Sequence, residues 1–211
     1  VGGYDPDYDG HTGYDPQGAK ALLDKFGFVD RDGDGFRDLP DGKPLTLQLA
    51  FTPSANERPY HELWQRSMKA VGIRTDFVIQ KWPDLLKMSR SGQLMMWSVA
   101  NTSATTDGYQ FLGLLYGGHA GLSNLSRFKL PEYDRLYEAS RALPEGPART
   151  RMFQQMSALV TAYSPWILNA YRIENNVIYP WVAGYKYNAL NPHPWQFYDI
   201  DNTRAHTPVA R

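Results

Sequence analysis

The chain has no cysteine among its 211 residues, which excludes disulfides, thiolate zinc sites and thiol nucleophiles. It also has no apolar run near the roughly 20 residues of a membrane span, and no signal peptide is visible at its beginning, V-G-G-Y-D-P-D. The 22 basic and 22 acidic residues cancel, and no Lys or Arg run indicates a nucleic-acid partner. Because 42% of the residues are hydrophobic, we still expect a globular domain with a core.

Catalytic motifs are equally scarce. His61 and Glu62 begin like the helix of a zinc protease, but Gln65 stands where the second histidine is needed. The sequence contains no nucleophile elbow, dinucleotide fingerprint or phosphate loop. Paired carboxylates come together in space rather than in sequence, so a hydrolase acting on peptides or glycans stays open as an alternative.

An acidic stretch, D-R-D-G-D-G-F-R-D-L-P-D at residues 30–41, has the spacing of a calcium loop. Such a loop takes its ligands from positions 1, 3, 5, 7, 9 and 12, with glycine at position 6. The predicted ligands are Asp30, Asp32, Asp34, Phe36 through its main-chain carbonyl, Asp38 and Asp41. Asp41 replaces the usual longer glutamate, which predicts weaker binding.

The residues after this stretch decide what kind of loop it is. Pro40, Gly42 and Pro44 prevent the second helix of an EF-hand, so the loop connects a helix to a strand. We expect a structural calcium ion there, since a filled carboxylate cage leaves no open position for chemistry. The alternative is a tight glycine turn with solvated aspartates. A purely structural calcium-binding module is thus a third hypothesis for the chain.

Periodicity predicts an α/β fold. Residues 15–27 form a helix that begins at the N-cap Asp15 and ends at Gly27. A strand over 45–51, a helix over 54–71 and a strand over 73–79 make a βαβ unit, hence two parallel strands. A helix over 83–91, a buried strand over 94–100, helices over 131–142 and 147–163, and a strand after residue 165 complete the prediction.

Residues 101–126 form a long loop rich in glycine, hydroxyl and aromatic side chains, a composition typical of a functional segment. Trp97 ends the preceding strand and offers a flat stacking face. The predicted ligand-binding residues are Trp97, Asn101, Thr102, Asp107 and Tyr109. The alternative is that Trp97 is an ordinary core residue.

Several stretches in order resemble one family. They are Y-D-P-Q-G-A-K-A-L-L-D-K-F-G-F (14–28), the acidic loop with D-G-K-P-L-T-L (41–47), L-P-E-Y-D-R-L-Y-E-A (130–139), P-W-V-A-G-Y (180–185) and N-P-H-P-W-Q-F-Y-D-I-D (191–201). This order is similar to that in extracellular solute-binding proteins of family 5, the receptors of peptide-type ABC importers.

The resemblance implies a periplasmic-binding-protein fold of the second type. Residues 1–172 would be the C-terminal ligand-binding lobe, the third domain of the family, and residues 173–211 a hinge and tail that return to the first lobe. It implies a non-enzymatic receptor outside the cytoplasmic membrane that closes its lobes on a peptide or another small polar solute and presents it to the membrane subunits of an importer.

Two further expectations follow from the resemblance. Without the first lobe, the apolar tail is expected to fold back or to pair with another copy. Peptide-binding members carry an aspartate three positions after the tryptophan, whereas this chain has Ala100 there. A peptide with a free amino terminus is therefore less certain as the ligand, because a buried ammonium needs a partner; Asp107 is a candidate replacement.

Overall fold

The computed structural model describes residues 13–102, 105, 107–169, 173, 175–186 and 194–203. The first helix, α1 (Pro16–Lys25), begins as predicted: the Asp15 carboxylate accepts a hydrogen bond from the Gly18 N–H at 2.8 Å. Its end is also as predicted, because Gly27 takes a positive φ of 80°, a conformation that glycine adopts without strain.

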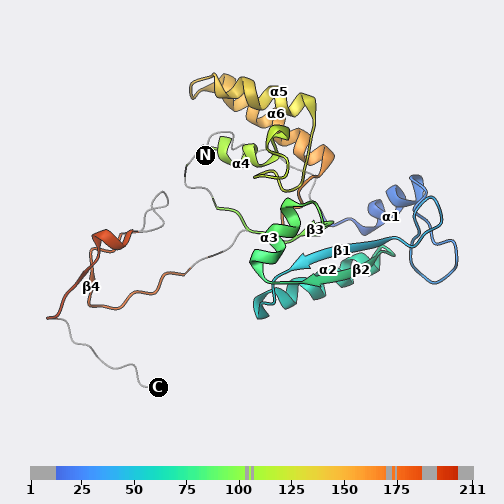
Figure 1. Cartoon of the computed structure of the whole chain (residues 1–211), viewed down its shortest axis with the longest axis horizontal. Coiled ribbons are helices and arrows are strands. Elements are labelled where there is room, and N and C mark those ends of the chain that lie inside the picture. Colours follow the sequence, from blue (N-terminus) through green and yellow to red (C-terminus); the bar gives the residue numbers. More distant parts are fainter. Residues whose placement is uncertain are drawn as a thin grey trace, which may run out of the picture.

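A three-stranded parallel sheet carries the first part of the chain (Figure 1). Strand β1 (Thr46–Phe51) lies in the centre and pairs in parallel with β2 (Arg74–Ile79) and β3 (Met96–Trp97). Helix α2 (Arg58–Ala70) connects β1 to β2 and packs against β2. The predicted βαβ unit is confirmed, and the buried core of this part contains Leu49, Ala50, Phe51, Val71, Ile73 and Leu85.

Strand β3 is shorter than the sequence predicts. The expected strand covers residues 94–100, but only Met96 and Trp97 pair with β1. Met95 and Val99 are exposed, so the prediction of a buried strand over the whole segment is wrong. The reason is that β3 is an edge strand, paired on one side only, and apolar side chains there do not require two covered faces. The expected strand after residue 165 is likewise not formed over residues 166–169, and residues 170–172 lie outside the described residues.

The second part of the chain is helical. Helix α3 (Trp82–Arg90) still belongs to the sheet part, between β2 and β3, whereas α4 (Tyr109–Leu112), α5 (Pro131–Arg141) and α6 (Pro147–Tyr163) follow β3 and form the helical part. Helices α5 and α6 pack together over a core of Leu115, Tyr133, Tyr137, Phe153 and Met156. Helix α4 lies inside the segment that the sequence predicts to be a loop, and the Tyr133 hydroxyl fixes its end by donating to the Leu112 carbonyl at 2.7 Å.

One arginine joins these helices to the sheet part. Arg127 has a positive φ of 54°, and its guanidinium donates a hydrogen bond to the Arg90 carbonyl at the end of α3. The same guanidinium lies against Gly92 and Gly121, neither of which has room for a larger side chain without movement of the arginine. The segment that precedes α5 therefore makes a contact between the helical part and the sheet part.

A short antiparallel pair ends the described chain. Strand β4 (Val182–Ala183) pairs with β5 (Asp199–Ile200), and the Asp201 N–H donates to the Trp181 carbonyl at 2.8 Å. In Figure 1 this pair lies apart from the sheet and from α5 and α6. In the part of the chain that the structure describes, no helix is both long and apolar enough to span a bilayer.

Candidate functional site

Trp97 lies at the carboxyl edge of the parallel sheet. It is the last residue of β3, and Trp82, the first residue of α3, follows shortly after the end of β2. Because β1, β2 and β3 are parallel, all three strands end at the same edge, the place where open α/β sheets bind ligands. The two indole rings contact each other there, with centroids 4.8 Å apart and planes tilted by 42°.

Trp97 is not a fully buried core residue, which was the alternative that the sequence left open. Its side chain is half-buried, and its Nε1 atom is buried with no hydrogen-bond partner among the described residues. Trp82 covers part of the ring and is itself 47% exposed. The pair therefore combines a supported inner ring with an accessible outer ring.

Asn101 and Thr102 follow on the chain and are both exposed. Residues 98–106, S-V-A-N-T-S-A-T-T, contain no charged side chain. The segment after β3 thus presents amide and hydroxyl groups, which both donate and accept hydrogen bonds.

Asp107 belongs to the helical part rather than to the sheet edge. Its Oδ2 atom accepts a hydrogen bond from the Arg149 guanidinium at 2.6 Å, and its Oδ1 atom accepts one from the Tyr109 N–H at 2.9 Å. Burial by itself would raise the pKa of Asp107, but these two donors outweigh it and hold the pKa below its usual value of 3.8. The carboxylate is therefore ionised and already matched by a cation.

Tyr109 lies in a stack of aromatic rings. Its ring is 4.6 Å from that of Tyr137, which is 4.8 Å from that of Tyr116 on the other side. The Arg149 guanidinium, which lies 5.7 Å from the Tyr109 ring centroid, also donates to the Ser140 carbonyl. Asp107 and Tyr109 thus hold α4 against α5 and α6, while Trp97 contacts Trp82. The five predicted ligand-binding residues fall into two groups, and their role in binding stays a prediction.

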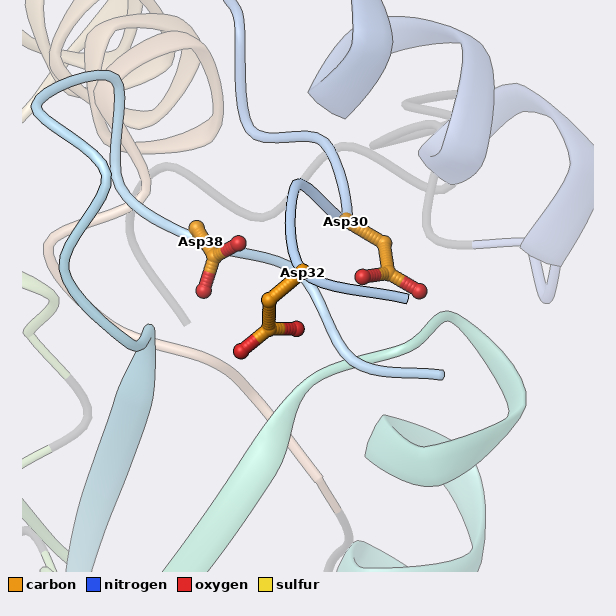
Figure 2. A group of neighbouring side chains, drawn as sticks. All are labelled: Asp30, Asp32 and Asp38. Atoms are coloured by element: carbon orange, nitrogen blue, oxygen red, sulfur yellow. The ribbon is translucent and has the colours of Figure 1, made fainter. Parts of the chain in front are cut away.

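The acidic loop brings three of its predicted ligands together. Carboxylate oxygens of Asp30, Asp32 and Asp38 lie within 4.8 Å of one another (Figure 2). Asp38 is 2% exposed, and one of its oxygens accepts a hydrogen bond from the Arg31 N–H. Both oxygens of Asp30 accept main-chain N–H groups of the loop, from Gly33 and Gly35.

The other predicted ligands have different partners. The Asp34 carboxylate pairs with Arg74, whose guanidinium lies 4.7 Å from the centroid of the Phe36 ring. Asp41 pairs with Lys43 at 2.7 Å, and the hydrogen bonds from Lys43 lower the pKa of Asp41. Carboxylate oxygens are suited to a hard cation such as calcium. Of the six predicted ligands, however, the structure brings together the carboxylates of three, Asp30, Asp32 and Asp38. Calcium binding stays a prediction.

Two residues that contact the predicted ligand-binding residues were not predicted from the sequence. They are Trp82, which contacts Trp97, and Arg149, which pairs with Asp107. Trp82 had a usable signal, because an aromatic residue that follows shortly after a strand of a parallel sheet lies at the same edge as Trp97. Arg149 had none, since it is 42 positions from Asp107 in the sequence.

His61, which begins the stretch that resembles a zinc-protease helix, is part of an aromatic cluster. The His61 ring is packed between Phe51 and Phe77, with ring centroids 4.2 Å and 5.1 Å away. A surface groove of about 600 Å³ lies between α5 and α6, and another of about 410 Å³ lies beside the acidic loop. Neither is lined by the five predicted ligand-binding residues.

The sheet part of the chain is thus a parallel α/β unit with two tryptophan side chains at the carboxyl edge of its sheet, the edge at which folds of this class bind ligands. The chain belongs to the bacterial extracellular solute-binding proteins of family 5, because the sequence model of that family's middle region matches residues 1–122, more than half of the chain. The family places the chain outside the cytoplasm, and its members are binding proteins rather than enzymes. The hydrolase alternative has no support.

Individual relatives agree with this assignment. Heme-binding protein A of Haemophilus influenzae is 28% identical over 174 residues, which are 82% of this chain and 30% of that protein. Among solved structures, the oligopeptide-binding protein AppA from Bacillus subtilis, in complex with a nonapeptide, superimposes with a TM-score of 0.76 at 18% identity, over 94% of this chain and 40% of its own. A periplasmic oligopeptide-binding protein from Thermotoga maritima with bound mannohexaose gives 0.66 at 19% identity, over 72% and 30%.

These likenesses establish the fold of the chain and show how much of each relative's length it spans. The periplasmic-binding-protein fold predicted from the sequence is confirmed. The chain spans about a third of the length of the proteins that it matches.

Proposed function

We propose that this chain is the C-terminal ligand-binding lobe, with its hinge and tail, of the solute-binding component of an ABC importer. The complete receptor captures a peptide or another small polar solute outside the cytoplasmic membrane by closing two lobes, and delivers it to the membrane subunits. Residues 1–172 form the lobe, and residues 173–211 return to the other lobe.

The observation that carries this proposal is the position of Trp97. A half-buried indole at the carboxyl edge of a parallel sheet lies where α/β folds bind ligands. The relatives support a solute as the ligand, since their names record heme, a nonapeptide and mannohexaose. Lobe closure is the hinge motion by which two-lobed receptors take up their ligands.

The test uses the complete receptor that contains this chain. Isothermal titration calorimetry against a panel of di- to hexapeptides, oligosaccharides and metabolites is expected to find a ligand, and small-angle scattering is expected to show compaction when it binds. Trp97→Ala should weaken that binding by about tenfold or more while the circular dichroism spectrum is retained. Tyr14→Ala, at an exposed position before α1, is the matched control.

Two results would contradict the proposal. One is a receptor that binds no member of the panel, and the other is turnover of a peptide or glycoside by the purified protein. If Trp97→Ala binds as tightly as the wild type, Trp97 is not part of the ligand site and the proposal loses the observation that carries it.

A further inference from the structure

We propose that Arg127 is a positioning residue for ligand binding. It clamps the helical part of the chain to the sheet part and thereby sets the shape of the segment between Ser98 and Asp107, which carries Asn101 and Thr102. The inference rests on the proposed function, because this segment binds a ligand only if the chain is part of a solute receptor.

The segment between Ser98 and Asp107 is attached to a different part of the chain at each end. At its start, the Ser98 N–H donates a hydrogen bond to the Ala50 carbonyl of β1 at 3.1 Å. At its end, the Asp107 carboxylate pairs with the Arg149 guanidinium of α6 at 2.6 Å. The distance that the segment spans is therefore set by how the helical part lies on the sheet part.

The side chain of Arg127 reaches from the helical part to the sheet part. Its guanidinium donates a hydrogen bond to the carbonyl of Arg90, the last residue of α3. A cation is favoured at that end of a helix, since the last carbonyls form the negative end of the helix dipole. Gly92 of the sheet part and Gly121 of the helical part leave room for it, because a Cβ atom would lie 3.0 Å from a guanidinium nitrogen at Gly92 and 3.1 Å at Gly121.

The main chain of Arg127 is held by the helical part. Its φ of 54° is sparsely populated by residues other than glycine, and such strain persists only where the surrounding structure fixes it. The fully buried Asn124 fixes it here: its Nδ2 atom donates to the carbonyls of Tyr116 at 3.0 Å and Phe128 at 2.8 Å, and its own carbonyl accepts from the Arg127 N–H at 3.3 Å. Arg127 therefore has a fixed base in one part and a hydrogen-bonded tip in the other.

Arg127 acts from the edge of the sheet opposite to Trp97. Because β2 and β3 both run parallel to β1, α3 between them returns the chain from the carboxyl edge to the amino edge. Trp82 begins α3 beside Trp97, and Arg90 ends it. A loss of affinity on substitution of Arg127 is therefore not the loss of a ligand contact at the edge that carries Trp97.

The first experiment compares three variants of the complete receptor by double electron–electron resonance. Arg127→Met removes the donors, Arg127→Lys keeps a cation that can donate, and Arg135→Met, at an exposed position of α5, is the matched control. Spin labels are placed at Gln65 on α2 and Gln155 on α6, both exposed. Arg127→Met is expected to broaden the distribution of distances between the labels, whereas Arg127→Lys and the control keep the wild-type width.

The second experiment is calorimetry with the panel of peptides, oligosaccharides and metabolites described above. Each compound that the wild type binds should bind Arg127→Met about fivefold or more weakly, because the binding geometry is then populated only part of the time. Arg127→Lys and Arg135→Met should bind within about twofold of the wild type. Urea midpoints distinguish lost binding from lost folding, and Arg127→Gly, in which glycine adopts the positive φ without strain, replaces Arg127→Met should that variant not fold.

The outcomes separate this inference from the proposed function. If Arg127→Met leaves the distance distribution unchanged, the clamp does not exist, and if it leaves the affinity unchanged, the clamp does not position the binding segment. Either result overturns the inference while the receptor function stands. A receptor that binds no member of the panel overturns the proposed function together with this inference.

Discussion

His61 is a polar residue in an apolar place. Its Nε2 atom is buried with no hydrogen-bond partner among the described residues, while its ring contacts Phe51 and Phe77. A buried polar atom without a partner costs free energy, so we predict that His61→Phe raises the free energy of unfolding by about 1 kcal/mol. Urea denaturation at a fixed pH checks this.

His119 provides the matched control. Its Nδ1 atom lies 3.2 Å from the Gly113 carbonyl oxygen, so His119→Phe removes a hydrogen bond and should lower the free energy of unfolding. Equal effects of the two substitutions would contradict the argument that the missing partner of His61 matters.

The Asp107–Arg149 pair predicts a dependence of stability on pH. Because the folded state holds the pKa of Asp107 below its usual value of 3.8, the ionised pair stabilises the fold above that value. The stabilisation is lost as the pH falls through the lowered pKa. Asp107→Asn should therefore lose less stability than the wild type between about pH 5 and about pH 2.5, as judged from urea midpoints. Identical losses would refute the link.

At the scale of elements, the acidic loop is the clearest test of a prediction from spacing. Asp34 pairs with Arg74 and Asp41 with Lys43, so the predicted ligands whose oxygens lie within 4.8 Å of one another are the other three carboxylates. We predict calcium binding with a dissociation constant of about 1 mM, typical of weak extracellular sites. Calorimetry with calcium chloride measures it.

A matched pair of variants controls that measurement. Asp38→Asn should abolish calcium binding, whereas Asp76→Asn, at an exposed position of β2, should not change it. If Asp38→Asn gives the same heat as the wild type, the loop is a glycine turn with solvated aspartates and the calcium hypothesis fails.

The β4–β5 pair depends on one glycine. Gly184 has a φ of 79°, and a Cβ atom there would lie 2.1 Å from the Phe197 carbonyl oxygen. Gly184→Ala is therefore predicted to separate the two strands, while the sheet and the α5–α6 core keep their stability. Hydrogen exchange at the Asp201 N–H, which donates to Trp181, should become fast. Gly13→Ala, with open space around the new methyl group, is the control.

At the scale of the whole molecule, the tail decides how the chain behaves by itself. Val177 is 94% exposed, Trp195 72% and Phe197 60%. Apolar surface of this kind marks an interaction site. We propose that in the complete receptor it contacts the other lobe, and that the isolated chain associates through it.

Sedimentation velocity tests that association. The isolated chain is predicted to show a sedimentation coefficient that rises with concentration, and the double variant Trp195→Ser with Phe197→Ser should remain a monomer. A wild-type chain that stays monomeric with a protease-sensitive tail would contradict self-association, without bearing on the function of the complete receptor.

The local rules of the sequence predicted several elements well. Asp15 and Gly27 bound α1 as expected, and the alternation around Leu49 and Phe77 predicted the parallel βαβ unit, because caps and periodicity act over a few residues. The length of β3 was not predictable in the same way. An edge strand pairs only as far as its neighbour allows, and that limit is a property of the sheet.

For the candidate site too, some features follow from the sequence and others from the tertiary structure. Its residue types, the uncharged segment after Trp97 and the spacing of the acidic loop are determined by the sequence itself. Which of these side chains meet was decided only by the tertiary structure: Trp97 contacts Trp82, Asp107 is neutralised by Arg149, and Asp34 is drawn away by Arg74. The physical reason is that stacking and charge pairing act between atoms a few ångströms apart, and only the folded chain brings residues so distant in sequence to that separation.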